Sequence, residues 1–559
     1  MFRSLVQSGT PTRVFYRRIH LAALLSALAF FSVSTIAHAD AREEFVAAIT
    51  KLPAASYAEK KEIAKALVDL QQPGTKQLLQ AFLDGNLYAR TADNRVFITA
   101  EANDPLQLTD ALTGQSAGSA AAAGFDQIGT NNGLRKALRG DIAQFDLRSK
   151  DSVVRLAAVT EMLRSLNEDS IAELRAYKAK ETDRAVKTEI EIGLALADIT
   201  SEDVTIRIHA VETLSHSLNP KAYNALQSLL AQSADGKYLE TNADVRKSAL
   251  DAVSHINLWR DVYGLVETMF FGLSLGSVLV LAAIGLAITF GVMGVINMAH
   301  GELMMLGAYT TYVVQLCMPN HIGASILVAI PLAFIVSGSV GILIERGLVR
   351  FLYGRPLETL LATFGVSLIL QQIVRDIFSA NNRPVETPQW MSGSWQINEA
   401  LSITFNRLYI VLFTFIVFAV LLWVLKRTRL GLTVRAVAQN RAMARAMGVR
   451  SEWVDAMTFG LGSGIAGVAG VALSQLTNVG PNLGQQYIVD SFMVVVFGGV
   501  GNLWGTMIGG MSLGVVNKVL EPYSGAVLAK IFVLIALILF IQRRPRGLFP
   551  QKGRAAEQQ

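Results

Sequence analysis

The feature that most limits how this chain can fold is a long apolar stretch that carries almost no charge. Between Val262 and Glu345, the only Asp, Glu, Lys or Arg side chains are those of Glu267, Glu302 and Glu345 itself. A helix needs about 20 apolar residues to cross the ~30 Å hydrocarbon layer of a bilayer. In such a helix every backbone polar group finds its partner within the segment, so no unpaired amide faces lipid. The stretch therefore predicts a bundle of membrane-spanning helices.

Apolar segments of spanning length recur through the rest of the chain. They lie at about 265–290, 302–318, 323–345, 359–378, 406–425, 455–475 and 525–541. A further stretch, 488–520, is apolar but interrupted by glycines, which predicts either two short helices or a re-entrant pair.

Lys and Arg are concentrated in three loops of this half, as they are in the cytoplasmic loops of membrane proteins. The loops are Arg346–Arg355, Lys426–Arg450 and Arg543–Arg554. If the N-terminal part lies outside the cytoplasm and the tail inside, the number of crossings is odd. The sequence then predicts about nine crossings, or about seven if 488–520 is re-entrant.

The first residues have the pattern of a secretory signal. Residues 1–39 combine a basic start, the apolar run Leu21–Ala37 and the small residues Ala37 and Ala39 at the positions that a signal peptidase reads. An uncleaved anchor helix is the alternative. In both cases the residues that follow are predicted to lie outside the cytoplasm.

Residues 40–260 hold most of the charge and are predicted to form a soluble, mainly helical domain. Apolar residues recur at helical spacing in Ala41–Leu70. A small hairpin is predicted for Leu87–Arg90 against Val96–Thr99. The small residues of Ala117–Gly124 predict a mobile link.

A short pattern, an aliphatic residue followed by Arg-x-x-Ala, recurs at the start of predicted helices. The copies begin at Val154, Ile206 and Val245, with a looser copy at Val186. An acidic residue suited to a helix start precedes them, such as Asp151, Asp203 or Asp244. This arrangement resembles HEAT-like helical repeats, which stack to bury a shared core. A helical bundle with a coincidental likeness is the alternative.

The sequence argues against several other classes of protein. The net charge of +6 and pI of about 9.2 fit basic cytoplasmic loops, and no nucleic-acid-binding motif accompanies them. The single cysteine, Cys317, has no partner for an internal disulfide. No phosphate-binding Gly-x-x-x-x-Gly-Lys-Ser/Thr motif, nucleophile elbow or metal-ligand spacing occurs. We therefore expect neither an enzyme nor a bound cofactor or metal.

Polar residues within the apolar half are the candidates for a functional site. Asn297, His300 and Glu302 fall at or near membrane depth, where a polar group is costly unless it is paired or lines a wet path. Capping the junction between two helices is the alternative role. Farther along, Gln371 and Arg375 lie at the end of an apolar segment, where a bond across one helical turn, such as Gln371 to Arg375, and snorkelling to the membrane interface explain them without transport.

The residues of this half are recognisable as a family. The run Gly272–Tyr309, which contains Asn-x-Ala-His-Gly-Glu at 297–302, closely resembles the first membrane segments of permeases in branched-chain amino acid and amide ABC importers. The resemblance extends from about 262 to Pro550. Permeases of the branched-chain amino acid branch consist of little more than the membrane core, whereas a signal peptide and a helical domain before it resemble the urea-importer branch.

The resemblance implies an all-α fold class, a polytopic permease of the bacterial inner membrane. The implied parts are a signal peptide 1–39, a HEAT-like extracytoplasmic domain 40–260, the permease domain 262–550 and a cytoplasmic tail 551–559. The implied cargo is urea, with branched-chain amino acids or short amides as the alternative. A passive urea or ion channel is the alternative from another class.

The resemblance also implies partners, because ABC importers hydrolyse ATP on separate subunits. These partners are a second permease subunit, cytoplasmic ATPase subunits and an extracytoplasmic solute-binding protein, besides membrane lipid and a small-molecule substrate; nucleic acid is not expected. Hydroxyl and amide groups would suit urea, a neutral molecule with N–H donors and a carbonyl acceptor. The candidates for the translocation path are Ser274, Ser277, Asn297, His300, Glu302 and Thr363.

The basic loop 426–453 is the second candidate region. A single helix, Val434–Met447, is predicted there, with Gly448 as its C-terminal cap and with Arg441 and Arg445 on one face. By resemblance this helix couples the permease to its ATPase; a basic helix lying on anionic lipid is the alternative. The expected coupling residues are Arg435, Asn440, Arg441, Met443, Arg445, Met447 and Gly448.

Overall fold

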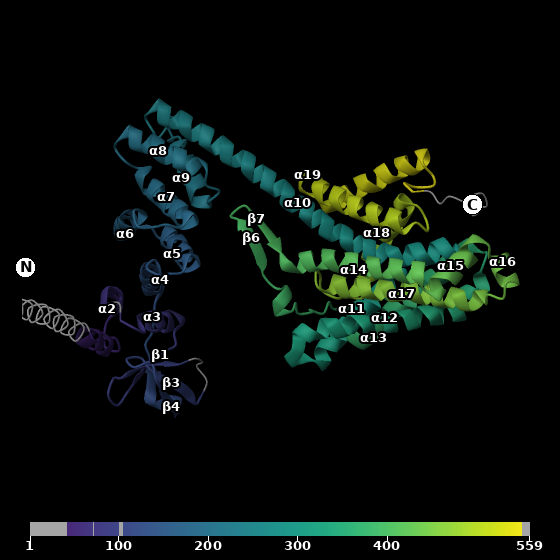
Figure 1. Cartoon of the computed structure of the whole chain (residues 1–559), viewed down its shortest axis with the longest axis horizontal. Coiled ribbons are helices and arrows are strands. Elements are labelled where there is room, and N and C mark those ends of the chain that lie inside the picture. The colour runs from purple at the N-terminus through teal and green to yellow at the C-terminus, as the bar shows by residue number, and fades with distance from the viewer. Residues whose placement is uncertain (1–41, 71, 100–103, 550–559) are drawn as a thin grey trace, which may run out of the picture. The chain divides into compact units, whose positions relative to one another are not determined.

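The computed structural model of the chain describes residues 42–70, 72–99 and 104–549 (Figure 1). The chain divides into two compact units, the first ending at Ile256 and the second beginning at Asn257. We describe each unit by itself.

The boundary between the units falls within the long helix α10 (Ala243–Met293). The sequence predicts a soluble domain up to 260 and a membrane domain from 262. The expected signal segment, 1–39, and the expected tail, 551–559, lie outside the described residues.

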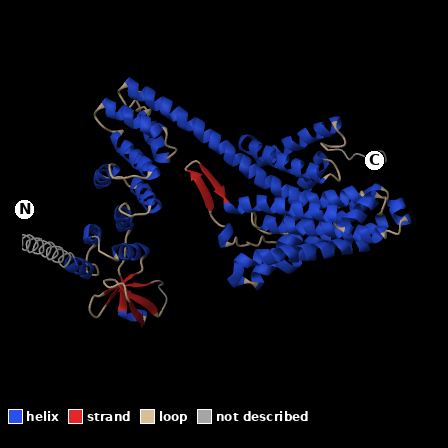
Figure 2. Cartoon of the chain, in the orientation of Figure 1, coloured by secondary structure: helices blue, strands red, loops and turns tan. Residues whose placement is uncertain are grey.

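Unit 1 begins with helices that pack against a small antiparallel sheet (Figure 2). Residues 42–51 are helical, and α2 (Tyr57–Leu70) and α3 (Thr75–Asp84) follow. The five strands lie in the order β4-β3-β2-β1-β5. They are β1 (Leu87–Arg90), β2 (Val96–Thr99), β3 (Leu106–Asp110), β4 (Ser116–Ala120) and β5 (Phe125–Gln127). The predicted hairpin is confirmed as β1 and β2, but a wholly α-helical fold is wrong for this part of the chain.

The predicted mobile link at 117–124 is also wrong, because β4 and a 3₁₀ turn (Ala122–Gly124) occupy it. Strand β4 pairs with β3 through its backbone, and its small Ser, Ala and Gly side chains are mostly exposed. Sequence patterns reveal a strand by alternating burial of apolar side chains. Strand β4 buries none, so its sequence gave no such signal.

The rest of unit 1 is a succession of short helices around one apolar core. They are α4 (Asn132–Asp146), α5 (Ser152–Arg164), α6 (Glu168–Lys178), α7 (Arg184–Asp198), α8 (Val204–Ser215) and α9 (Pro220–Leu229), followed by the start of α10.

Two of the predicted helix starts are confirmed, because the carboxylates of Asp151 and Asp203 accept hydrogen bonds from the first backbone N–H groups of α5 and α8. Asp244 does not have this role. The side chain of Asn242 caps α10 instead, accepting from the N–H groups of Asp244 and Val245.

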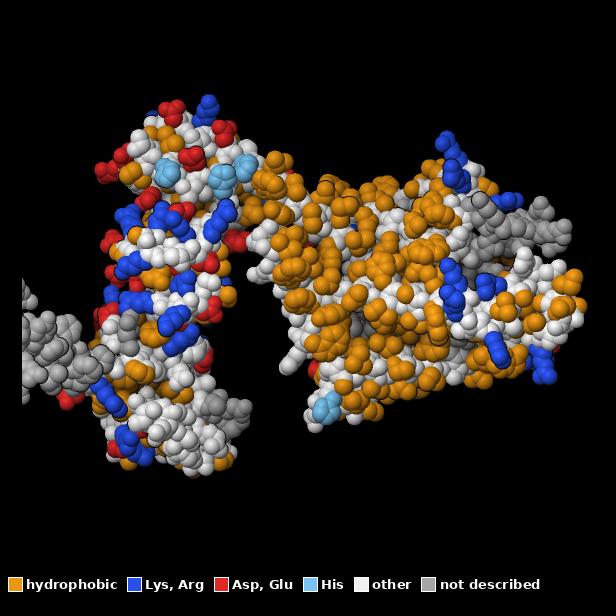
Figure 3. All heavy atoms as spheres, viewed as in Figure 1, with side chains coloured by type: hydrophobic (Ala, Val, Ile, Leu, Met, Phe, Trp, Pro, Cys, Tyr) orange, Lys and Arg blue, Asp and Glu red, His pale blue; other side chains and the backbone are white. Residues whose placement is uncertain are grey.

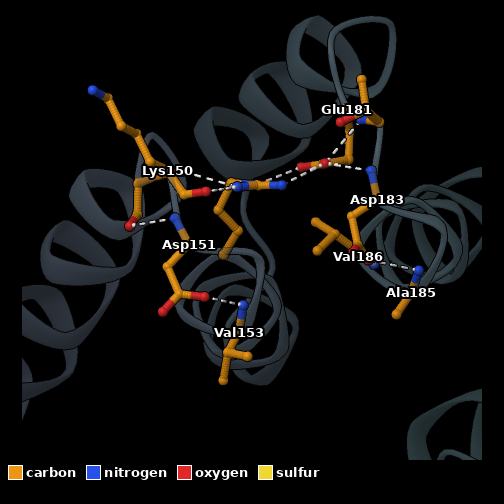
Figure 4. A network of polar contacts seen from close by, with 10 residues as sticks. Lys150, Asp151, Val153, Glu181, Asp183, Ala185 and Val186 are labelled. Carbon is orange, nitrogen blue, oxygen red and sulfur yellow. Dashed lines mark hydrogen bonds and ion pairs between the residues drawn. The ribbon is translucent and has the colours of Figure 1, made fainter.

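The arginines of the recurring pattern make the same contacts in each copy. Arg155, Arg207 and Arg246 each donate to the two backbone carbonyls that lie five and six residues earlier in the chain. Arg155 and Arg207 also bond to acidic side chains from the loop ahead of a later helix, Glu181 and Glu240. Figure 4 shows Glu181 on the chain leading to Asp183, with Asp151 capping α5. The arginine therefore fixes the loop that leads into its own helix.

Unit 2 is built mainly from long apolar helices, with two short helices, Arg429–Gln439 and Arg441–Ala446, among them. They are α11 (His300–Cys317), α12 (Ile322–Gly347), α13 (Pro356–Phe378), α14 (Phe405–Arg427), α15 (Arg429–Gln439), α16 (Arg441–Ala446), α17 (Ser451–Ser474), α18 (Leu483–Gly498) and α19 (Leu503–Arg543), besides the end of α10. A two-stranded hairpin, β6 (Ser394–Asn398) and β7 (Leu401–Thr404), precedes α14. Apolar side chains cover the visible face of this unit (Figure 3).

Six of the described helices have the length and composition of a membrane span, namely α10, α12 with the short 3₁₀ turn before it, α13, α14, α17 and α19. Helix α18 is apolar but shorter. The stretch 488–520 is divided between α18 and the start of α19, with a turn at 499–502. Gly525, with φ of 79°, joins two helices within α19. The count of about nine crossings stays a prediction.

Helix α17 is the centre of unit 2, and it packs closely against α11 and α12. Glycines make these approaches possible: a Cβ atom on Gly307 of α11 would overlap the backbone of Gly467, and one on Gly470 would overlap the backbone carbonyl of Met304. In lipid, helices associate through such close backbone packing rather than through the hydrophobic effect.

Candidate functional site

Helix α13 carries a buried row of polar residues on one face and exposed apolar residues on the other. Thr359, Thr363, Ser367 and Gln371 follow one another at intervals of four residues and are all at most 3% exposed. A spacing of four keeps them on one face of the helix. The opposite arrangement is found in soluble proteins, so this buried polar stripe indicates a polar interior within an apolar surround.

The apolar face of α13 is correspondingly exposed. Leu357, Leu361 and Leu368 are 81%, 70% and 48% exposed. These side chains fit a surface that lipid covers.

The carboxyl group of Glu302, on α11, lies against the middle of this stripe. Its Oε1 atom accepts hydrogen bonds from the hydroxyl of Ser367 at 3.0 Å and from the amide Nε2 of Gln371 at 2.6 Å. Its Oε2 atom is buried and has no hydrogen-bond partner among the described residues. An acidic side chain that is 1% exposed in an apolar unit therefore keeps one acceptor open.

The chain between α10 and α11, which precedes Glu302, is non-helical. The polar stripe of α13 provides a hydrogen-bond partner for part of its backbone. The hydroxyl of Thr363 accepts from the N–H of Met298 at 3.1 Å. The side-chain oxygen of Asn297 accepts from the N–H of Ala299, while its Nδ2 atom is buried without a partner in the described part of the chain. Irregular backbone among membrane helices is tolerated where protein or a cavity surrounds it.

The other end of the stripe reaches a small polar cavity. Arg375, one turn beyond Gln371, donates to the side-chain oxygen of Asn482 at 2.8 Å. A cavity of about 290 Å³ adjoins Asn482 and is lined mainly by neutral polar side chains. They include Asn382, Asn478 and Gln486. The line of polar groups therefore extends from this cavity along α13 to the turn before α11.

The structure brings together some of the predicted path residues and places others elsewhere. Asn297, Glu302 and Thr363 belong to the polar line. His300 is fully buried where α10 approaches α17, with its Nε2 atom 2.9 Å from the carbonyl of Ala282. The side chain of Ser277 bonds to the backbone of its own helix, α10.

Ser274 also lies on α10, and its hydroxyl is buried without a hydrogen-bond partner among the described residues. Ser367 and Gln371 are not among the path residues predicted from the sequence. The suggested bond from Gln371 to Arg375 is wrong, because Gln371 bonds to Glu302 and Arg375 to Asn482. The fourfold spacing of polar residues along α13 was the available signal.

The basic loop differs from its prediction as a single helix over 434–447. Helix α15 ends at Gln439, and Asn440 is extended, with φ of −157° and ψ of 98°. The side-chain oxygen of Asn440 then accepts from the N–H of Met443 and caps α16. The predicted cap at Gly448 is confirmed: its φ is +86°, and its N–H donates to the carbonyl of Arg445.

The break at Asn440 turns Arg441 inward, whereas Arg445, Met443 and Met447 are exposed. Arg441 bonds to both carboxylate oxygens of Asp455 on α17 and stacks over the ring of Tyr353. Arg445 donates to the hydroxyl of Ser451 at 2.7 Å. Met443 and Met447 are 61% and 78% exposed. The exposed face of α16 therefore presents two methionines beside Arg445.

Comparison with known proteins covers this same unit. The family model of the branched-chain amino acid transport system permease component matches residues 268–541. The high-affinity branched-chain amino acid transport system permease protein LivH of Salmonella typhimurium is 32% identical over 293 residues, which are 51% of this chain and 94% of that protein. BraD of Pseudomonas aeruginosa, a permease protein of the same description, is 30% identical over 52% of this chain and 96% of its own length.

A more distant relative is the ribose import permease protein RbsC of Escherichia coli, 25% identical over 49% of this chain and 85% of its own length. No solved structure matches the chain.

The apolar helices and their polar interior define a multi-pass membrane permease. The chain belongs to the family of branched-chain amino acid transport system permease components, the membrane subunits of ABC importers. Its relatives are transport components.

Proposed function

We propose that this chain is a permease subunit that imports urea or a similarly small neutral amide in an ATP-driven transporter. The observation that carries the proposal is the buried polar stripe of α13 with the open acceptor of Glu302. Urea has four N–H bonds and one carbonyl acceptor, so hydroxyl, amide and carboxyl groups along one line suit it.

The cavity beside Asn482 supports the neutral cargo. Its lining offers side-chain amides and a threonine hydroxyl, and Leu483 is the large apolar side chain among them. A branched-chain amino acid would need an apolar pocket for its side chain as well as partners for both of its charges. The amide-rich lining matches a small, uncharged, hydrogen-bonding solute better.

Branched-chain amino acids are the second candidate cargo. The observation in their favour is the similarity to LivH and BraD, which extends through nearly the full length of both relatives. The domain that would favour urea, unit 1, lies outside the matched residues 268–541. The similarity that favours branched-chain amino acids therefore says nothing about unit 1.

In the proposed mechanism, solute enters on the outer side and the ATPase changes which side of the permease is open. The coupling surface is the exposed face of α16, with Met443 and Met447 as its apolar contacts. An apolar helix face offered to the cytoplasm suits a groove in a partner protein. ATP and its hydrolysis belong to partner ATPase subunits, and this chain itself holds no cofactor in the proposal.

Unit 1 is proposed to lie outside the cytoplasm, after a cleaved signal segment, and to contact or position the solute-binding protein. Its successive short helices and the recurring arginine contacts support HEAT-like repeats. A second permease subunit completes the proposed assembly.

Uptake of labelled urea and labelled leucine by the assembled transporter tests the cargo. The complete complex is reconstituted in vesicles with the binding protein outside and ATP inside. The proposal predicts ATP-dependent urea uptake that unlabelled urea, but not unlabelled leucine, suppresses. Preferred leucine uptake would establish the second candidate, and urea flux without ATP would indicate a passive channel.

A further inference from the structure

We propose that a groove in unit 2, at the junction of α10, α14, α15 and the start of α19, binds an anionic phospholipid. The groove has a volume of about 750 Å³. The groove has an apolar floor, which suits an acyl chain, and a cationic rim, which suits a phosphate headgroup.

The floor of the groove is apolar and is part of the membrane core. Ile288 of α10 belongs to a buried cluster that the side chains Leu422 and Leu425 of α14 and Leu503 of α19 pack against. Trp504 also lines the groove, and its ring meets Phe418 edge to face at 5.1 Å. A hydrocarbon chain would find an apolar surface there.

The same surface continues outward along α14. Val420 and Trp423, beside the groove residues Leu422 and Leu425, are 55% and 62% exposed. These side chains lie on a helix with the composition of a membrane span, where the surrounding medium is lipid. Because the groove continues this surface, the membrane itself supplies the occupant more readily than a soluble partner does.

The rim of the groove carries positive charge. Lys426 ends α14, Arg435 lies on α15, and both side chains are exposed. The lining contains no Asp or Glu, and no ion pair joins either cation to another described residue. The Nε atom of Arg435 donates to the carbonyl of Gly431, which leaves its terminal nitrogens to bind a phosphate. Figure 3 shows Lys and Arg gathered near α15 and α16 beside the apolar surface.

The position of the groove gives such a lipid a regulatory role. Val434 and Ala438 of α15 line one side, and α10 lines the other. Val292 of α10 packs against both the membrane cluster and the cluster that holds α15. A bound lipid would therefore stabilise the position of α15, the helix that leads into α16.

The test measures lipid binding to the assembled transporter, so its result does not depend on which solute is imported. The complex is placed in nanodiscs of phosphatidylcholine and phosphatidylglycerol at about three to one, then released for native mass spectrometry to count retained phosphatidylglycerol. The test variant is Lys426→Gln with Arg435→Gln. The matched control, Arg427→Gln with Arg429→Gln, removes the same charge from neighbouring positions that do not line the groove.

We expect the test variant to bind phosphatidylglycerol roughly 30-fold more weakly than wild type, since each basic residue near a membrane surface is worth about 1 kcal/mol. The control variant should retain it. Equal retention by wild type and test variant would overturn the proposal. So would cross-linking from Trp504→Cys to an ATPase subunit in place of lipid, because the occupant would then be a protein. A test variant that fails to assemble is replaced by Lys426→Gln alone, with roughly fivefold weaker binding expected.

Discussion

Glu302 is the residue on which the account of transport depends most. Its carboxyl group is buried, and two hydrogen bonds to one oxygen hold it against α13 while the other oxygen stays open. Burying a carboxyl group among membrane helices costs free energy, and polar groups at membrane depth are commonly functional. The sequence identified Glu302 by its place in an uncharged stretch. It did not identify Ser367 and Gln371, because a hydroxyl or amide within a span has many structural roles.

We predict that Ser367→Ala lowers the rate of urea uptake roughly 10-fold, because it removes one of the two hydrogen bonds that orient Glu302, and a hydrogen bond of this kind contributes about 0.5–1.5 kcal/mol. The matched control is Ser337→Ala, since Ser337 is equally buried but donates to the backbone carbonyl of Leu303. Initial uptake rates at equal amounts of assembled complex measure the difference. Equal uptake rates in the two variants would show that the orientation of Glu302 does not contribute to transport.

Asp141, in α4, makes the stability of unit 1 depend on pH. Burial raises the pKa of Asp141 to about 6, above the value near 3.9 expected in the unfolded chain. The folded state therefore binds this proton more tightly. The stability that Asp141 contributes is fully present below about pH 4 and is lost as the pH rises through about 6.

We predict that Asp141→Asn makes unit 1 more stable at pH 7, by about 1–2 kcal/mol once solvent screening is allowed for, and that this gain disappears near pH 4. The effect is measured as the thermal unfolding of unit 1, monitored by limited proteolysis of the full-length protein at several pH values. Asp235→Asn, a change at an exposed loop carboxylate, is the control. A gain that does not change with pH would contradict the assignment to the Asp141 proton.

At the scale of elements, the sequence predicted the long helices of unit 2 well, because the length of an apolar segment is a strong signal. It predicted strands poorly. Strands β3 to β5 are three to five residues long, so the alternation of buried Leu106 and Leu108 in β3 is a short signal, and β4, with small exposed side chains, is defined by its pairing with β3. The break at Asn440 was missed for a related reason: a residue that caps a helix also fits inside one, and α17 decides between the two by pairing Asp455 with Arg441.

The orientation of α16 changes which residues should couple the permease to its ATPase. Arg441 and Arg445 hold α16 against α17, so replacing them would disturb the fold as well as the coupling. We predict that Met443→Glu with Met447→Glu abolishes ATP-dependent uptake, because charge on an apolar docking face weakens association by several kcal/mol. Assembly with the ATPase, measured by co-purification, should fall in parallel.

Trp453→Glu serves as the control for that prediction. Trp453 is 55% exposed on the neighbouring helix α17 and lies outside α16, so it tests whether any added charge on this side has the same effect. Retained uptake in the methionine variant would place the coupling surface elsewhere.

At the scale of the whole molecule, the two units differ in what they reveal about function. Unit 2 carries the family match and the polar line, and its class could be predicted from sequence because membrane helices and the motif at 297–302 are both local features. The proposal of urea rests on the polar stripe of α13 with Glu302, on the amide-lined cavity and on unit 1. Which polar residues meet across helices could not be predicted, since that depends on how α11 and α13 pack.

We predict that deleting residues 42–255, with the signal segment kept, reduces binding-protein association and lowers uptake at limiting binding protein by roughly 10-fold or more, as loss of a docking surface would. Uptake should recover when binding protein is supplied in large excess. Unchanged association and uptake at limiting binding protein would show that unit 1 has another role.

The most direct test of the central claim is whether the polar stripe of α13 faces the solute. The only cysteine of the chain, Cys317, is exposed, so a Cys317→Ser background allows single cysteines to be placed at will. Cysteine at 363, 367 or 371 lies on the stripe, and cysteine at 361, 364 or 368 lies on the exposed apolar face. Labelling by a charged, membrane-impermeant thiol reagent during ATP turnover, with and without urea, distinguishes the two faces.

We predict that the stripe positions are labelled and that urea suppresses this labelling, whereas the lipid-facing positions are not labelled. Stripe positions that stay unreactive throughout turnover while the complex transports urea would contradict this prediction.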